Sequence, residues 1–120
     1  MDFSASTPIY LQVVEEIKRL LISGELTPGE KLWSARDMAL RYQINPNTAA
    51  RVYKELEAQQ LCYTKRGLGT YLTEEPGIAG RLRKEKAERL IGDFIKELRA
   101  LGYTKEELHQ IFENALNNEK

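Results

Sequence analysis

The stretch from residue 34 to residue 71 constrains the fold most strongly. It reads SARDMALRYQINPNTAARVYKELEAQQLCYTKRGLGTY. Ser34 is a favourable N-cap residue, and Asp37 follows it at the spacing of a capping box. Asn45 and Pro46 then restart a helix, because Asn caps a helix well and Pro fits the first helical position. The pattern predicts a short helix, a tight turn and a second helix that ends near residue 60.

Both predicted helices have an apolar face at helical spacing. These faces consist of Ala35, Met38 and Ala39 in the first helix, and of Ala49, Val52, Tyr53, Leu56 and Ala58 in the second. The opposite face of the second helix is polar, and no acidic residue occurs between Asn45 and Lys54. We therefore expect one face of the second helix to pack on a core and the other to meet a polar partner.

A β-hairpin with a basic tip follows the second helix. Side chains on the two faces of a strand alternate along residues 61–66, with Leu61, Tyr63 and Lys65 on one face and Cys62, Thr64 and Arg66 on the other. Gly67-Leu68-Gly69 supplies a turn, and residues 70–73 form the returning strand. Lys65 and Arg66 lie at the predicted tip. The whole stretch thus has the plan of a winged helix-turn-helix.

These residue types suit double-stranded DNA. A helix fits the major groove and can present its first turns to base edges. Asn47 can bond adenine, Thr48 can contact phosphate or a thymine methyl group, and Arg51 can reach guanine or phosphate. A small helical domain with a solvated charged face is the alternative. The order of helix, turn, capped helix and basic hairpin favours DNA binding.

The run from Pro8 to Thr73 resembles the DNA-binding domain of the GntR family of bacterial transcription regulators. Four motifs carry the resemblance: G-x-L-x-P-G-x-x-L at residues 24–32, S-x-R-[DE] at Ser34, N-P-N-T-x-x-R at Asn45, and R-G-x-G-T-[YF] at Arg66. The short segment that follows is similar to that of the YtrA-like branch.

The resemblance implies specific contacts to DNA. On the helices it implies base or phosphate contacts from Ser34, Arg36, Asn45, Asn47, Thr48, Arg51 and Lys54. On the hairpin it implies minor-groove or phosphate contacts from Lys65, Arg66 and Gly67. The contact of Arg36 with a base follows from the resemblance alone.

Four positions depart from the family pattern. Trp33 stands where the family usually has Pro, and Gln60 stands where Gly usually ends the second helix. Ala35 and Cys62 replace larger or β-branched apolar residues. We expect Trp33 to pack on the connection that follows the first helix of the chain. Roles of Trp33 as an interface anchor, and of Trp33 or Cys62 as a sensor, are left open.

The composition excludes several classes of protein. The 120 residues hold 18 basic and 18 acidic side chains, so DNA binding needs a local basic patch. The single Cys and single His offer no metal site and no internal disulfide. No arrangement of catalytic residues stands out, so we expect no enzyme and no cofactor. Without an apolar span or a signal peptide, we expect a soluble, cytoplasmic protein.

Two domains are predicted, a DNA-binding domain at residues 1–75 and a helical dimerisation tail at residues 76–120. A first helix should run from Pro8 to Ser23, with Thr7 as its cap and with Ile9, Val13, Ile17, Leu20 and Leu21 buried. The run Glu74-Glu75-Pro76-Gly77 marks the boundary, because Pro and Gly do not continue a strand well.

The predicted tail consists of two amphipathic helices. The first runs from residue 78 to residue 101, and Thr104 with Glu107 caps the second. Two such helices cannot bury both apolar stripes against each other alone. A twofold dimer solves this problem, and a hairpin packed within a monomer is the alternative. The expected dimer residues are Ala87, Leu90, Ile91, Phe94, Ile95, Leu98, Leu101, Leu108, Ile111 and Phe112.

The sequence therefore predicts a mainly α fold with a small β-hairpin, a winged helix-turn-helix followed by a two-helix dimerisation tail. The predicted function is that of a dimeric repressor that binds a palindromic operator in double-stranded DNA. A winged-helix protein-interaction module without specific DNA binding is the alternative. An unidentified small-molecule effector is left open, and the operator and the regulated genes are not readable from the sequence.

Overall fold

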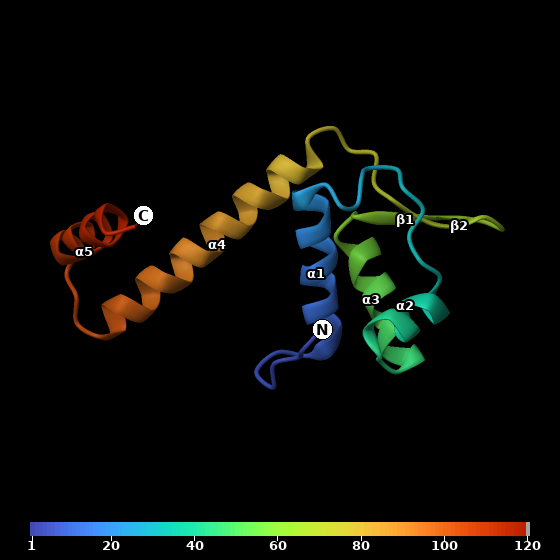
Figure 1. Cartoon of the computed structure of the whole chain (residues 1–120), viewed down its shortest axis with the longest axis horizontal. Coiled ribbons are helices and arrows are strands. Elements are labelled where there is room, and N and C mark those ends of the chain that lie inside the picture. Colours follow the sequence, from blue (N-terminus) through green and yellow to red (C-terminus); the bar gives the residue numbers. More distant parts are fainter. Residues whose placement is uncertain (120) are drawn as a thin grey trace. The chain divides into compact units, whose positions relative to one another are not determined.

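The computed structural model describes residues 1–119 and contains, within them, five helices and one β-hairpin (Figure 1). The helices are α1 (Ile9–Ser23), α2 (Ala35–Tyr42), α3 (Pro46–Ala58), α4 (Ile78–Ala100) and α5 (Lys105–Asn117), and the strands are β1 (Cys62–Lys65) and β2 (Gly69–Leu72). The chain forms two compact units, Met1–Leu82 and a second that begins at Arg83. The predicted class, mainly α with a small hairpin, is confirmed.

Helix α1 ends where the sequence predicts and begins one residue later than expected. Gly24 ends it in the left-handed conformation with φ of 84°, which glycine adopts without steric cost. Pro8, not Thr7, occupies the cap position, and no side chain caps the helix start. Ile9 is exposed because it lies in this first turn, before the helix meets the core.

The predicted residues Ser34 and Asn45 cap the two helix starts, but within residues 1–119 no hydrogen bond returns from the Asp37 side chain to Ser34, so the capping box of α2 is only half formed. Ser34 Oγ accepts a hydrogen bond from the Asp37 backbone N–H at 3.1 Å. Gln43 turns the chain after α2 with φ of 53°. Asn45 Oδ1 accepts from the Asn47 N–H at 2.8 Å, and Pro46 opens α3. The turn therefore has the residues that the predicted helix–turn–helix needs.

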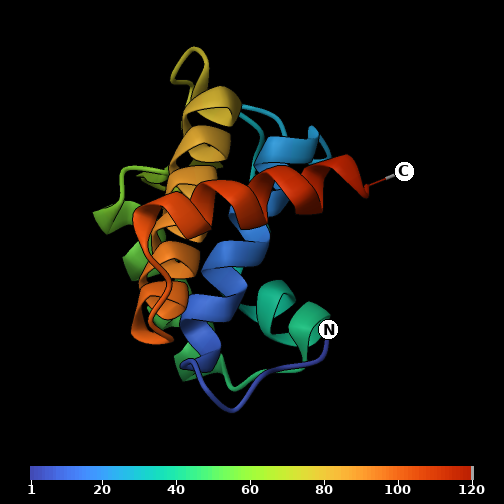
Figure 2. The same cartoon turned by 90° about the vertical axis from the view of Figure 1, so that its left-hand side faces the viewer.

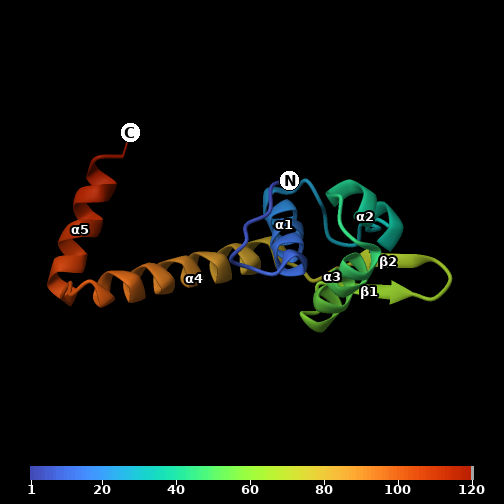
Figure 3. The ribbon, with the colours of Figure 1, turned by 90° about the horizontal axis from the view of Figure 1, so that it is seen from below.

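Strands β1 and β2 pair antiparallel, and the hairpin extends beyond α2 and α3 (Figure 3). A third segment joins its edge: Leu32 N–H donates to the Thr70 carbonyl at 2.8 Å, and Leu72 N–H donates to the Glu30 carbonyl at 2.8 Å. Lys31 and Tyr71 are the bridged pair between these segments. The loop before α2 is therefore hydrogen-bonded along one edge of the β1–β2 hairpin, which we call the wing.

The core of the first unit lies between α1, α2, α3 and the base of the wing. Each element contributes its predicted apolar face, except that Ile9, Ala35 and Ala58 are exposed. Two residues of the first turns of α4, Ile78 and Leu82, also belong to this core. Fully buried side chains such as Ile17 of α1 and Leu56 of α3 contribute to the hydrophobic driving force for folding.

The second unit contains the rest of α4 and α5. Thr104 and Glu107 form the predicted capping box: Thr104 Oγ1 accepts from the Glu107 N–H, and the Glu107 carboxylate accepts from the Thr104 N–H. Helix α5 runs across the direction of α4 instead of folding back along it (Figure 2). Phe94 and Phe112 make an edge contact with ring centroids 6.4 Å apart.

The apolar stripe of this unit is only partly covered. Leu108 is buried, and Ile95, Leu98, Ile111 and Phe112 are half-buried. The other expected dimer residues, Ala87, Leu90, Ile91, Phe94 and Leu101, are exposed. Leu90, Ile91 and Phe94 each expose more than half of their surface, at 53%, 53% and 57%. Exposed apolar surfaces of this kind are typical of interaction sites.

Candidate nucleic-acid interface

Helix α3 presents a polar stripe away from the core. Asn47, Arg51 and Lys54 follow one another at spacings of four and three residues, so they share one face, and all are exposed. The buried residues of the helix, Ala49, Val52 and Leu56, occupy the opposite face. Thr48 lies at the edge of the stripe and is half-buried. The predicted contacts of α3 therefore come together on one accessible surface.

Ser34 and Asn45, the two residues that cap α2 and α3, each retain an unused side-chain hydrogen-bond donor. Ser34 Oγ is occupied as an acceptor by the Asp37 N–H, but its own hydroxyl proton remains available. Asn45 Oδ1 is likewise occupied by the Asn47 N–H, which leaves the side-chain NH₂ group. Both groups are exposed at a helix start, where backbone N–H groups also favour an anion.

Arg51 rests on an aromatic ring from α1. Its guanidinium carbon lies 4.1 Å from the centroid of the Tyr10 ring, a distance typical of a cation–π contact. Tyr10 is half-buried and lies beside the core. The sequence did not single out Tyr10, because its position outside the apolar stripe of α1 gives no sign of a contact with α3.

Trp33 links the start of α2 to the rest of the first unit. Its ring makes an edge contact with the Tyr42 ring, with centroids 6.1 Å apart, and the Arg41 guanidinium lies 4.2 Å from its centroid. The Tyr53 hydroxyl donates a hydrogen bond to the Trp33 carbonyl. These contacts tie Trp33 to α2 and α3, whereas the sequence suggested the connection after α1.

Arg36 lies in the first turn of α2 and is exposed. At the tip of the hairpin, Lys65, Arg66 and Gly67 are exposed as well. The Lys65 ammonium lies 4.4 Å from the centroid of the Tyr71 ring, which stacks on Tyr63. The predicted residues thus lie on the first turn of α2, the outer face of α3 and the tip of the wing.

The basic side chains of this region lack acidic partners. The seven Lys and Arg residues from Lys31 to Arg66 form no ion pair within residues 1–119. Nearby acids accept hydrogen bonds from neutral groups, Glu55 from Gln59 at 3.1 Å and Glu57 from Thr64 at 2.9 Å. Some cations outside this region are paired, as in Arg19 with Glu16 and Arg81 with Glu75. The surface therefore keeps an uncompensated positive charge.

The other features of residues 1–119 do not form a second candidate site. Burial raises the pKa of the Cys62 thiol to about 12, with a smaller contribution from Glu57, so the thiol stays protonated at neutral pH. Burial also raises the pKa of the Tyr53 hydroxyl. Within residues 1–119 no group of His, Cys, Asp and Glu could hold a metal ion. Among the same residues, no helix combines the length and apolar character that crossing a membrane requires.

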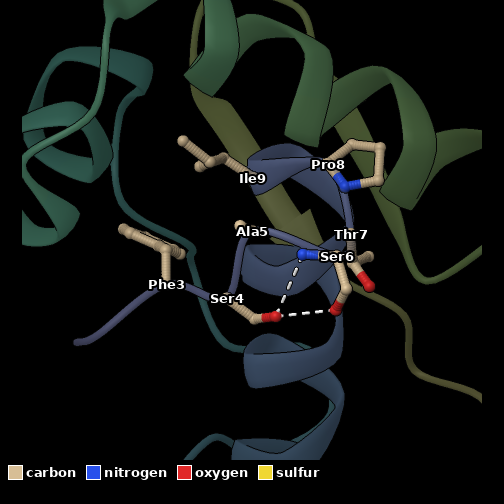
Figure 4. A pocket seen from close by; sticks show the side chains of 7 residues that line it. All are labelled: Phe3, Ser4, Ala5, Ser6, Thr7, Pro8 and Ile9. Carbon is tan, nitrogen blue, oxygen red and sulfur yellow. Dashed lines mark hydrogen bonds between the residues drawn. The ribbon is translucent and has the colours of Figure 1, made fainter.

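A hollow lies at the N-terminal segment, lined by Phe3, Ser4, Ala5, Ser6, Thr7, Pro8 and Ile9 (Figure 4). Its polar groups bond one another: Ser4 Oγ and Ser6 Oγ lie 2.7 Å apart, and the Ser6 N–H donates to Ser4 Oγ. The lining contains no charged side chain. It therefore lacks the convergent polar groups of a typical ligand site.

Comparison with known proteins decides the family. The model of bacterial regulatory proteins of the gntR family matches residues 9–72, which is more than half of the chain. The chain belongs to the GntR family. This GntR protein is thus a transcription regulator whose winged helix is a DNA-binding domain, and the predicted family and fold are confirmed.

Relatives of similar length support this assignment. The HTH-type transcriptional regulator YhcF of Bacillus subtilis is 41% identical over 107 residues, 89% of this chain and 88% of YhcF. The HTH-type transcriptional repressor YtrA of the same organism is 40% identical over 98 residues, 78% of this chain and 75% of YtrA. The structure of a GntR family regulator from Listeria monocytogenes superposes with a TM-score of 0.80 at 38% identity, covering 93% of this chain and 98% of that one.

Proposed function

We propose that this GntR regulator is a homodimeric repressor that binds a palindromic operator in double-stranded DNA. One observation carries the proposal: the cations of α2, α3 and the wing are exposed and have no acidic partner within residues 1–119. Phosphate groups of DNA are the anions that such a surface would neutralise. The relative YtrA is a repressor by name, which supports repression over activation.

The roles of individual residues follow from their positions. Helix α3 would enter the major groove, where Asn47 and Arg51 can reach base edges and Thr48 and Lys54 can reach phosphate. Arg36 would contact a base from the first turn of α2. Ser34 and Asn45 would donate their remaining protons to phosphate oxygens, since their acceptor atoms are already used as helix caps.

The wing would lie beside the same groove. Lys65 and Arg66 are exposed at its tip, and Gly67 adopts φ of 78° in open space. A tip of this size, with two cations and no side chain at position 67, can approach the minor groove or the phosphate backbone closely. We assign it a positioning role, because such contacts carry little base-specific information.

Dimerisation would occur through residues 76–120. The exposed apolar residues Leu90, Ile91, Phe94 and Leu101 support this assignment, since a second copy would shield them from water. A twofold dimer presents two recognition helices, so its operator should have two half-sites separated by one helical turn or a multiple of it. We place the protein in the cytoplasm, where the operator DNA of a bacterium lies.

The alternative, a winged-helix module that binds only protein, is not favoured. The close relatives are transcription regulators by name, and transcription regulators of this kind are not enzymes. Salt dependence separates the two functions directly. Affinity for DNA should fall steeply with salt, whereas an apolar protein interface should tolerate salt.

The test is selection of bound duplexes from a random pool of double-stranded DNA at physiological salt, followed by sequencing. The proposal predicts enrichment of one twofold-symmetric motif. A motif without symmetry would contradict the dimer on DNA but not DNA recognition. If no sequence is enriched, and the protein binds a fixed duplex no more tightly at 50 mM than at 200 mM salt, DNA binding itself is contradicted.

A further inference from the structure

Lys31 lies beside the wing although it precedes α2 in the sequence. Its backbone bridges to Tyr71, and the flanking hydrogen bonds at Glu30 and Leu32 fix this segment along β2. Side chains that are paired across neighbouring strands lie on the same face. Lys31 therefore shares a face with Tyr71, although its place in the sequence gives no hint of it.

Gly69 makes room for the Lys31 side chain. A Cβ atom at position 69 would lie 2.8 Å from Lys31 Cε and 3.5 Å from Lys31 Nζ. The first distance is shorter than real Cβ contacts allow, so any other residue at position 69 would displace the lysine. The backbone there also has φ of 121°, which favours glycine. The Lys31 side chain thus extends over the hairpin toward its tip.

Lys65 lies on the same face. It pairs with Gly69 across the hairpin, and its ammonium lies 4.4 Å from the centroid of Tyr71 and 5.7 Å from that of Tyr63. These four residues, Lys31, Tyr63, Lys65 and Tyr71, form what we call the wing lysine face. The opposite face of the hairpin is anchored in the core by Cys62 and Leu72.

Two ammonium groups on one face repel each other unless an anion lies near them. Glu74 accepts a hydrogen bond from the Tyr63 hydroxyl at 3.2 Å. Neither Lys31 nor Lys65 forms an ion pair with it or with any other residue in the range 1–119. The wing lysine face therefore carries two positive charges that no acidic side chain within residues 1–119 neutralises in an ion pair.

We propose that Lys31 is a DNA-contacting residue, and that the wing lysine face binds a backbone phosphate of the operator. The inference rests on the proposed function, since it extends the DNA surface from the wing tip to a residue before α2. The Lys65 ammonium packs against the stacked rings of Tyr63 and Tyr71. Because Gly69 has no side chain, the Lys31 side chain can lie over the same face of the hairpin. Lysine binds phosphate as a point charge, so this contact adds affinity without base preference.

The test compares the wild-type protein, Lys31→Ala, Lys31→Arg and the control Lys96→Ala on the selected operator over a series of salt concentrations. Each Lys31 removed from the complex should flatten the slope of log affinity against log salt by about 1. The loss should be the same on operator and on non-operator DNA. Lys31→Arg should retain the wild-type slope. Lys96 is exposed on α4, and Lys96→Ala should change neither the affinity nor the slope.

A second measurement locates the contact. Single phosphates of the operator are replaced by uncharged methylphosphonates, and the affinity of each duplex is measured for wild type and Lys31→Ala. We expect one position in each half-site where neutralisation weakens wild type but leaves Lys31→Ala unchanged. If the loss of affinity from phosphate neutralisation and the loss from Lys31→Ala are additive at every position, Lys31 makes no direct contact with a phosphate.

The outcomes distinguish the two proposals. If wild type shows a steep salt dependence and Lys31→Ala shows the same slope, the inference about Lys31 is wrong and the proposed function stands. If wild type shows no salt-dependent binding to any duplex, the proposed function fails and the inference fails with it.

Discussion

Two tyrosines of the core, the buried Tyr42 and the half-buried Tyr53, differ in whether their hydroxyl groups have a hydrogen-bond partner. Tyr53 donates to the Trp33 carbonyl, whereas Tyr42 Oη is buried without a hydrogen-bond partner among residues 1–119. A buried polar group without a partner costs free energy, while a satisfied one contributes modestly to stability. The same chemical change at these two positions should therefore have opposite effects.

We predict that Tyr53→Phe lowers the free energy of unfolding by about 0.5–1.5 kcal/mol, because the hydrogen bond to the Trp33 carbonyl is lost. Tyr42→Phe should leave the free energy of unfolding unchanged or raise it, because it removes only an unsatisfied hydroxyl. Urea denaturation of both variants measures the two effects. A larger loss in Tyr42→Phe than in Tyr53→Phe would contradict this description of the core.

The second residue-scale prediction concerns base recognition. Arg36→Ala and Asn47→Ala should each weaken binding to the selected operator by about 1–3 kcal/mol and relax base preference at one position in each half-site. Arg99→Ala removes an exposed cation from α4 and serves as the control. Competition with operators mutated at single positions measures the preference. Unchanged preference in both variants would contradict the assigned contacts.

At the scale of the elements, α3 ends in an unusual way. Gln59 is the C-cap, with φ of −87°, and Gln60 adopts the left-handed conformation, with φ of 59°. The sequence departs from the family pattern at this position, where Gly is usual, but the chain keeps the conformation that Gly would favour. A residue with a Cβ pays a steric cost there.

We predict that Gln60→Gly raises the free energy of unfolding by about 0.5–1 kcal/mol, because the steric cost exceeds the entropy that glycine adds to the unfolded chain. Gln59→Gly is the matched control. Its backbone is not left-handed, so glycine there should lower the free energy of unfolding by about 0.5–1 kcal/mol. Thermal unfolding compares them, and a loss of stability in Gln60→Gly would refute the strain.

The sequence predicted those elements whose ends are set by local chemistry. Ser34, Asn45 and Thr104 cap helices as expected, because a cap needs only residues within one turn. Contacts between elements were harder to predict. The Tyr10–Arg51 stack and the Lys31–Tyr71 bridge join residues distant in the sequence, and no spacing rule relates such pairs. Lys31 was therefore missing from the predicted contacts, whereas Lys65, in a recognisable hairpin, was included.

At the scale of the whole molecule, the exposed apolar stripe of the second unit is the surface through which we propose that two copies associate. Phe94 lies at its centre and is 57% exposed. We predict that Phe94→Glu converts the dimer to a monomer, because a carboxylate in an apolar interface has no partner. Lys96→Glu places the same side chain two residues away, outside the stripe, and should leave the dimer intact.

Size-exclusion chromatography with light scattering measures the mass of both variants. A wild-type protein that already has the mass of one chain at micromolar concentration would contradict the dimer. Because the helices of the first unit bury their own core, Phe94→Glu should keep its helical circular dichroism. It should bind the complete operator with reduced affinity, since the two recognition helices are no longer linked.

Trp33 is the one tryptophan of the chain and lies next to Ser34 at the start of α2. Its ring is half-buried, with the Arg41 guanidinium against it. Its ultraviolet emission therefore comes from a single known site beside the surface proposed to meet DNA. Fluorescence of the unlabelled protein can thus follow the arrival of an operator in real time, without a dye that would perturb the surface.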